Sequence, residues 1–160
     1  MKTTYGHFTG SEAEFTITDP RTPRAFDNFL WNDAIFSNVQ QTGVGYCDYQ
    51  VDGKEGVQLF TGVGRICDFD VFGRDHLMSR LIYVRDNVSG EFWNINWEPV
   101  RRAYESYACT HGPGHTTIRT KVEGIEAEFR IFIPCGDDPV ELWSIRLKNL
   151  SGRERSLSAF

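Results

Sequence analysis

The feature that most constrains the fold is a strict alternation of apolar and polar residues over residues 125–133. Its apolar members are Ile125, Ala127, Phe129, Ile131 and Ile133, and the charged residues between them are Glu126, Glu128 and Arg130. A period of two residues places these sets on opposite faces of one strand, with one face buried and the other solvated. Because Thr116 to Val122 and the turn Glu123-Gly124 precede this strand, we predict a β-hairpin over residues 116–133.

Other short segments of strand-like composition lie between turn residues. We expect strands or strand pairs at Tyr5–Phe8, Glu14–Ile17, Cys47–Val51, Val57–Phe60, Tyr83–Val100, Tyr104–Cys109, Val140–Asn149 and Arg155–Phe160. In the strand at residues 140–149, alternation predicts that Trp143, Ile145 and Leu147 point into the core. Irregular structure is expected as a crossover at residues 19–23, a loop or short helical turn at 26–31, a flexible loop at 38–46 and an irregular loop at 61–75.

Length, composition and charge restrict the class of protein. The 160 residues fit one domain, and an aromatic content of 14% with 15 glycines favours an all-β, antiparallel architecture. The formal net charge is −5, and no run of Lys or Arg exceeds Arg101-Arg102, which argues against a nucleic-acid partner. No apolar run approaches the ~18 residues of a membrane helix, and the first residues contain no apolar signal region. We therefore expect a cytoplasmic protein without a membrane partner.

The polar residues that could carry chemistry form no recognisable site. Cys47, Cys67, Cys109 and Cys135 contain no Cys-x-x-Cys pair, so free buried thiols are expected. Cys109, His111 and His115 surround a Gly-Pro-Gly turn that does not present two imidazoles to one ion, so neither a metal site nor a Cys–His nucleophile is assigned. The carboxylate pairs that could serve as glycosidase acid and base are Asp68 with Asp70, Glu126 with Glu128, and Asp137 with Asp138. Ordinary structural roles explain each pair more readily, so we predict no catalytic residue and no cofactor.

The segment Tyr83–Val100 carries two tryptophans, Trp93 and Trp97, close to the polar turn at residues 87–90. Two indoles in a β-hairpin suit either a platform on which a sugar ring stacks or ordinary core packing. Core packing is the more common role of such residues. Both interpretations remain open at the level of the sequence.

Six short motifs occur in an order that resembles a known family. They are Tyr5-Gly6-His7-Phe8; Glu14 to Thr18 with Pro20, Thr22 and Pro23; Gly45-Tyr46; Tyr83-Val84-Arg85-Asp86 with Ser89, Gly90, Phe92, Trp93, Trp97, Pro99 and Val100; His111-Gly112 with Gly114; and Val140-Glu141-Leu142-Trp143 with Lys148, Asn149 and Ser151. Together they resemble the N-terminal region of glycoside hydrolase family 94, formerly glycosyltransferase family 36, which includes cellobiose, cellodextrin and chitobiose phosphorylases. The resemblance extends over essentially all 160 residues, although residues 57–77 match poorly. The family's Gly-Gly-Tyr-Ser loop is Gly43-Val44-Gly45-Tyr46-Cys47 here, which leaves the disaccharide specificity open.

The resemblance implies an antiparallel β-supersandwich, similar to a galactose-mutarotase-like fold, that precedes an (α/α)6 barrel in a much longer protein. Residues 1–160 would then be the N-terminal part of one sandwich domain, because residues 156–160 follow a strand pattern with no turn after it and leave an unpaired edge. In that family the barrel carries the general-acid aspartate and the phosphate site. The implied reaction is inverting phosphorolysis of β-glucosides, with inorganic phosphate as co-substrate and no metal. The implied partners are a β-linked disaccharide or oligosaccharide and a second copy in a homodimer.

Two functions therefore remain open. In the first, the chain is a structural and dimer-forming part of such a phosphorylase, and Gln40 and Tyr46 are candidate contacts to the sugar site of the complete enzyme. In the second, it is a stand-alone carbohydrate-binding module that uses Trp93 and Trp97 as its platform. The unpaired strand expected at residues 156–160 and the lack of a sugar-site cluster favour the first function, and we expect this chain alone to be inactive.

Overall fold

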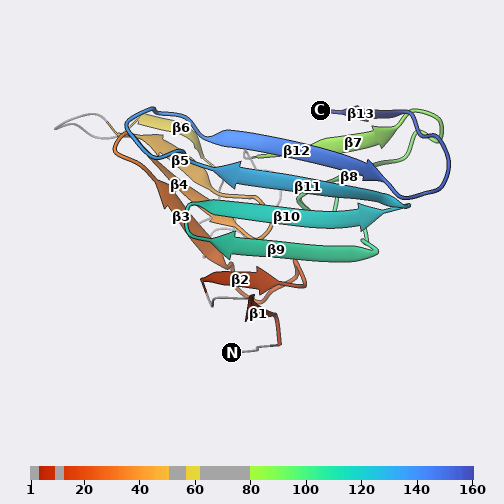
Figure 1. Cartoon of the computed structure of the whole chain (residues 1–160), viewed down its shortest axis with the longest axis horizontal. Helices are drawn as coiled ribbons and strands as arrows, with labels where there is room; N and C mark the ends of the chain where they lie inside the picture. Colours follow the sequence, from red (N-terminus) through yellow and green to blue (C-terminus); the bar gives the residue numbers. More distant parts are fainter. Residues whose placement is uncertain (1–3, 10–12, 51–56, 62–79) are drawn as a thin grey trace.

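A computed structural model describes residues 4–9, 13–50, 57–61 and 80–160. Within these ranges every regular element is a β-strand, and the strands form three antiparallel sheets (Figure 1). In Figure 1 the long strands β9, β10, β11 and β12 lie side by side, with β3 to β6 near one end of them and β13 near the other. The all-β prediction is therefore confirmed. No helix among the described residues is long and apolar enough to span a membrane.

The three sheets differ in size. The six-stranded sheet has the order β1 (Gly6–Thr9), β2 (Glu14–Ile17), β9 (Ser106–Gly112), β10 (His115–Val122), β11 (Ile125–Phe132) and β12 (Leu142–Asn149). The four-stranded sheet has the order β3 (Asp27–Trp31), β4 (Ile35–Gln40), β5 (Tyr46–Tyr49) and β6 (Val57–Thr61). The three-stranded sheet has the order β13 (Leu157–Ala159), β7 (Tyr83–Asp86) and β8 (Phe92–Asn94).

The hairpin predicted from the alternating pattern is formed by β10 and β11, which pair from His115 opposite Phe132 to Val122 opposite Ile125. Glu123 (φ +48°) and Gly124 (φ +74°) connect the strands, and two consecutive positive φ angles are the requirement of a tight type I′ turn. The expected strands at Tyr5–Phe8 and Glu14–Ile17 correspond to β1 and β2, which pair with each other, and the hairpin expected within Tyr83–Val100 is formed by β7 and β8.

One hydrophobic core joins the three sheets. Its fully or nearly fully buried members come from all of them and are Ile17, Leu30, Ile35, Val39, Cys47, Ile82, Val84, Trp93, Ile95, Cys109, Ile118, Val122, Ile125, Ala127, Phe129, Ile131 and Ile133. Burial of this many large apolar side chains, at roughly 1.5–3 kcal/mol each, is the main favourable contribution to folding. The core therefore fixes how the smaller sheets pack against the six-stranded sheet.

Two predictions for the four-stranded sheet are wrong. Residues 26–31 were expected as a loop or helical turn, but Asp27–Trp31 is strand β3, in which buried Leu30 lies between exposed Phe29 and Trp31. Residues 38–46 were expected as a flexible loop, but residues 38–40 belong to β4 and residues 37–45 are buried. In the first case, Leu30 points to one side of the strand, and Phe29 and Trp31 point to the other. In the second, side chains from distant parts of the chain donate hydrogen bonds to the buried backbone carbonyls of residues 38 and 41–43.

Two predictions for the last strands also need correction. Trp143, Ile145 and Leu147 lie on the face of β12 that continues the core face of β11, yet all three are exposed. The segment at residues 156–160 is not an unpaired edge, because β13 pairs with β7 and Phe160 exchanges two backbone hydrogen bonds with Tyr83. The irregular loop predicted after residue 61 lies outside the described residues, as do Val51 and Cys67.

Candidate functional site

The segment that contains both predicted sugar contacts is the turn between β4 and β5. Gln40 ends β4 and is buried, with 5% of its surface exposed, whereas Tyr46 begins β5 and is half-buried beside the ring of Phe36. The structure thus brings the two residues to opposite ends of one turn. Their predicted contact with a sugar stays a prediction.

Gly45 shows why this turn has its shape. Its φ is +151°, and a Cβ at this position would lie 1.9 Å from the carbonyl oxygen of Asn38. A larger residue would therefore displace the backbone of β4, so only glycine allows this close approach.

A buried ion pair between Arg80 and Glu141 also supports the β4–β5 turn. The Arg80 guanidinium binds the Glu141 carboxylate through two contacts, Nε to Oε1 at 2.5 Å and Nη2 to Oε2 at 2.6 Å. The side chains of Arg80 and Glu141 are 0% and 5% exposed. Arg80 Nη1 also donates to the backbone carbonyls of Asn38 at 3.2 Å and Gly43 at 3.4 Å. One arginine thus connects the segment before β12 to the β4–β5 turn.

Other polar groups complete this cluster. Ser37 accepts a hydrogen bond from Arg80 and donates one to Glu141, and the Trp143 indole N–H donates to Glu141. Burial by itself would raise the pKa of Glu141, but the hydrogen bonds and charge of Arg80 outweigh it and hold that pKa below its ordinary value. Glu141 is therefore ionised at neutral pH.

The turn is held by two further side chains. The Asn96 amide donates to the carbonyl of Thr42 at 3.0 Å and to that of Arg80 at 2.6 Å. The Tyr107 hydroxyl donates to the carbonyl of Gln41. Sequence analysis missed Arg80 and Asn96, since no local pattern marks them, whereas Glu141 lies in a motif that carried the family resemblance.

The two tryptophans have different environments. Trp93 is completely buried in β8, so the hypothesis of a sugar platform built from Trp93 and Trp97 together is wrong. Trp93 instead fills the core, as an aromatic residue of its size commonly does. Trp97 follows β8, is half-buried, and packs edge-on against Tyr104.

Cys109, His111 and His115 do not converge on one point. His111 Nε2 lies 2.9 Å from the Phe26 carbonyl and Nδ1 lies 2.9 Å from the Thr116 hydroxyl, so we infer that Nε2 donates and Nδ1 accepts. Burial lowers the pKa of His111 to about 4 and raises the pKa of the Cys109 thiol. His115 lies on the opposite face of the sheet, 3.4 Å from Glu14. The described residues contain no group of three or more metal-ligating side chains.

The remaining candidates lie at the surface or outside the described residues. Glu126 and Glu128 are on the solvent face of β11, where Glu128 pairs with Arg119 at 2.7 Å. Asp137 and Asp138 are exposed between β11 and β12, and Asp68 and Asp70 lie outside the described residues. Cys47 and Cys109 are free and buried as expected, but Cys135 is exposed.

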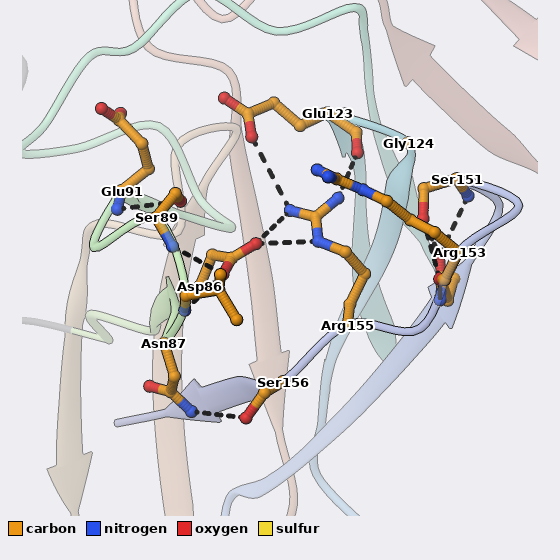
Figure 2. A network of polar contacts seen from close by, with 12 residues as sticks. Asp86, Asn87, Ser89, Glu91, Glu123, Gly124, Ser151, Arg153, Arg155 and Ser156 are labelled. Carbon is orange, nitrogen blue, oxygen red and sulfur yellow. Dashed lines mark hydrogen bonds and ion pairs between the residues drawn. The ribbon is translucent and has the colours of Figure 1, made fainter.

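A second charged cluster joins the three-stranded sheet to the six-stranded sheet (Figure 2). Arg155 binds Asp86 through Nε at 2.8 Å and Nη2 at 2.6 Å, and its Nη1 donates to the carbonyl of Glu123 in the β10–β11 turn. Asp86 also accepts the backbone N–H groups of Val88 and Ser89, which, together with Arg155, hold its pKa below the ordinary value. This cluster fixes three chain segments at one corner of the fold.

These features define a class of protein: an all-β domain of packed antiparallel sheets, whose buried charges position backbone segments. Among the described residues, Cys109, His111 and His115 do not converge on one point, and the candidate carboxylates Glu126, Glu128, Asp137 and Asp138 lie at the surface.

Comparison with known proteins gives the family. The model of the glycosyl hydrolase 94 supersandwich domain matches residues 70–160, and the chain belongs to this family. It is 38% identical over 159 residues to a solabiose phosphorylase of Paenibacillus borealis. It is 30% identical over 158 residues to an N,N'-diacetylchitobiose phosphorylase of Vibrio proteolyticus, and 30% identical over 156 residues to a 3-O-beta-D-glucopyranosyl-beta-D-glucuronide phosphorylase of Paenibacillus borealis. Each match covers 98% of this chain but only 18–19% of the relative's length. The predicted family and supersandwich fold are confirmed.

Proposed function

We propose that this chain is the N-terminal part of the sandwich domain of a disaccharide phosphorylase and that its role is structural. The relatives' names support the class of reaction, and their length, about five times that of the matched region, supports a larger protein. In this proposal the complete enzyme cleaves a β-linked disaccharide with inorganic phosphate in the cytoplasm, as a homodimer.

The observation that carries the structural role is the state of β12. Each of its residues from Leu142 to Asn149 is exposed, although β12 forms a complete ladder with β11. Trp143, Ile145 and Leu147 are 43%, 42% and 36% exposed on the core side of the sheet, opposite buried residues of β11. A long edge strand with an apolar inner face is a surface that proteins normally cover or pair.

We propose that further strands of the sandwich domain pair with β12 and cover its inner face in the natural protein. Hydrogen exchange tests this proposal directly. The β12 amides that point away from β11 should exchange at least about a hundredfold more slowly than unstructured peptide amides, as expected for a paired strand. Exchange of these amides at the unprotected rate in the natural protein would show that β12 is a free edge, and the structural role would be refuted.

Activity gives a separate test. The isolated 160 residues should release no sugar 1-phosphate from β-linked disaccharides in the presence of phosphate, because in this proposal the general acid belongs to another part of the complete enzyme. The natural protein should do so. Of the two candidate sugar contacts, Tyr46 is the better placed, because it is half-buried whereas Gln40 is almost inaccessible. Tyr46→Phe is therefore expected to raise KM, and an unchanged KM would remove Tyr46 from the site.

A further inference from the structure

Two parts of the chain that are distant in sequence, one of them in two short segments, meet at a pocket of about 270 Å³. They are residues 18–21 after β2, Trp97 after β8, and residues 103–107 at the start of β9. The pocket adjoins the β4–β5 turn, because the Gln41 amide donates to the carbonyl of Pro20 at 3.2 Å and the Tyr107 hydroxyl donates to the carbonyl of Gln41. Typical pockets for drug-sized ligands have ~300–1,000 Å³, so this pocket has the size for one small ring.

Aromatic side chains form one wall of the pocket. The rings of Trp97 and Tyr104 meet edge-on with centroids 5.3 Å apart, and those of Tyr104 and Tyr107 are parallel with centroids 6.1 Å apart. The Tyr104 hydroxyl accepts the backbone N–H of Trp97 at 2.8 Å and donates to the carbonyl of Asn94. The wall is therefore formed and held before any ligand binds.

The backbone at Trp97 is strained. Its φ is +73°, a conformation that a bulky side chain rarely adopts. The contact with Tyr104 and a hydrogen bond from the Arg101 N–H to the Trp97 carbonyl, at 2.8 Å, hold it there. Such strain costs free energy and is found preferentially where a side chain must be aimed at a ligand.

The rim of the pocket carries two carboxylates whose charges are already balanced. Asp19 pairs with Arg21 at 3.0 Å, and Glu105 pairs with Lys121 at 3.0 Å. A hydrogen bond from each cation is the largest influence that holds the pKa of its carboxylate below the ordinary value. The carboxylates are thus ionised acceptors without net local charge. This combination suits a neutral ligand rich in hydroxyl groups better than a cation, which would need uncompensated negative charge.

We propose that this pocket binds one pyranose ring of a neutral saccharide, with Trp97 against its apolar C–H face and Asp19 and Glu105 accepting its hydroxyl groups. The weakly positive C–H edge of a sugar is complementary to the negative face of an aromatic ring. The choice of a saccharide rests on the proposed function, whereas the pocket and its charge balance do not.

Fluorine NMR on the natural protein, labelled with 5-fluorotryptophan, can report on this pocket alone. The Trp97 resonance is assigned by its absence from the Trp97→Phe variant, and Trp31, which does not line the pocket, serves as the control resonance. Titration with methyl β-D-glucopyranoside should shift the Trp97 resonance saturably and leave that of Trp31 unchanged. Asp19→Asn should raise the glucoside concentration at the midpoint of the titration about tenfold, because a charged acceptor is lost. The Asp19 side chain is partly exposed, so this substitution should not affect folding.

Each other outcome overturns the proposal. A Trp97 resonance that does not respond to the glucoside shows that no sugar binds here, and an unchanged midpoint in Asp19→Asn shows that the rim makes no contact. A response to tetramethylammonium in place of the glucoside assigns a cation site. Phosphate-dependent cleavage of disaccharides is measured on the same samples, so failure of the proposed function and failure of this inference are seen separately.

Discussion

Replacing Glu141 by Gln should release the β4–β5 turn. The substitution keeps the size of the side chain but removes the charge that balances Arg80, whose guanidinium is completely buried. A cation left without its partner in the interior costs roughly 3–5 kcal/mol, which is a large part of the 5–15 kcal/mol that stabilises a typical domain. Because Arg80 binds the carbonyls of Asn38 and Gly43, the loss of stability should appear first in the β4–β5 turn.

In the unsubstituted protein, the contribution of Glu141 to the stability of the fold should also depend on pH. The pKa of Glu141 in the folded state is below its ordinary value of 4.5, so its ionisation stabilises the fold fully above that value. The contribution should be lost as the pH falls below about 4.5 and passes through the folded-state pKa. Glu141→Gln should show a weaker dependence over the same range, because Gln does not titrate.

Hydrogen exchange of the amides of residues 37–45 in the natural protein measures this loss. A decrease of 3 kcal/mol in local stability corresponds to faster exchange by more than about a hundredfold. Glu128→Gln is the matched control, since Glu128 pairs with Arg119 at 2.7 Å on the surface, where one partner is 55% exposed. Such pairs contribute about 0–1 kcal/mol. Equal exchange rates in the two variants would refute the assignment of this buried pair as the support of the turn.

Three further outcomes are expected. Gly124→Ala should destabilise the protein by about 1–2 kcal/mol, because the φ of Gly124 is +74°. Gly114→Ala should destabilise it less, because a Cβ at Gly124 would lie 3.0 Å from Ser151, whereas a Cβ at Gly114 would have no neighbour within 4 Å; urea denaturation compares the two variants. Asp86→Asn should lower the melting temperature at pH 7, and its difference from the unsubstituted protein should shrink as the pH falls below 3.8 and through the lowered pKa of Asp86; differential scanning calorimetry over this pH range checks the sign. A thiol reagent at pH 8, followed by peptide mapping, should modify exposed Cys135 in the native protein, whereas Cys109, buried and with a raised pKa, should react only after unfolding.

The parts of the fold that the sequence predicts are those fixed by neighbouring residues. In β11 the alternation of residues 125–133 marks a strand with one buried face, and the Glu123-Gly124 turn fixes its partner. Strand β3 was missed because its apolar residues lie within one helical turn of each other in the sequence. The segment becomes a strand by pairing with β4, and Phe29 and Trp31 then lie on its exposed face. The spacing of apolar residues within a short strand does not show which other strand it pairs with.

The candidate site depends on contacts that sequence analysis does not contain. The turn at residues 40–46 resembles a mobile loop in composition, because it is polar and rich in glycine. Its burial is explained by Arg80, Asn96 and Tyr107, whose positions in the chain have no periodic relation to it. Conversely, the inward-pointing residues of β12 were assigned to the correct face, but their exposure follows from what covers the sheet and not from the strand itself.

The chemistry of the buried pair indicates what it does. A pair of apolar side chains at positions 80 and 141 would stabilise the fold at least as well, since buried ion pairs contribute little net stability. Only an arginine offers enough donors to bind Glu141 and two backbone carbonyls of the turn at once. We infer that the pair fixes the shape of residues 37–45 and couples that shape to the position of Glu141 beside β12. The Glu141→Gln exchange experiment separates this coupling from general destabilisation: loss of protection confined to residues 37–45 supports it, whereas equal loss throughout the core contradicts it.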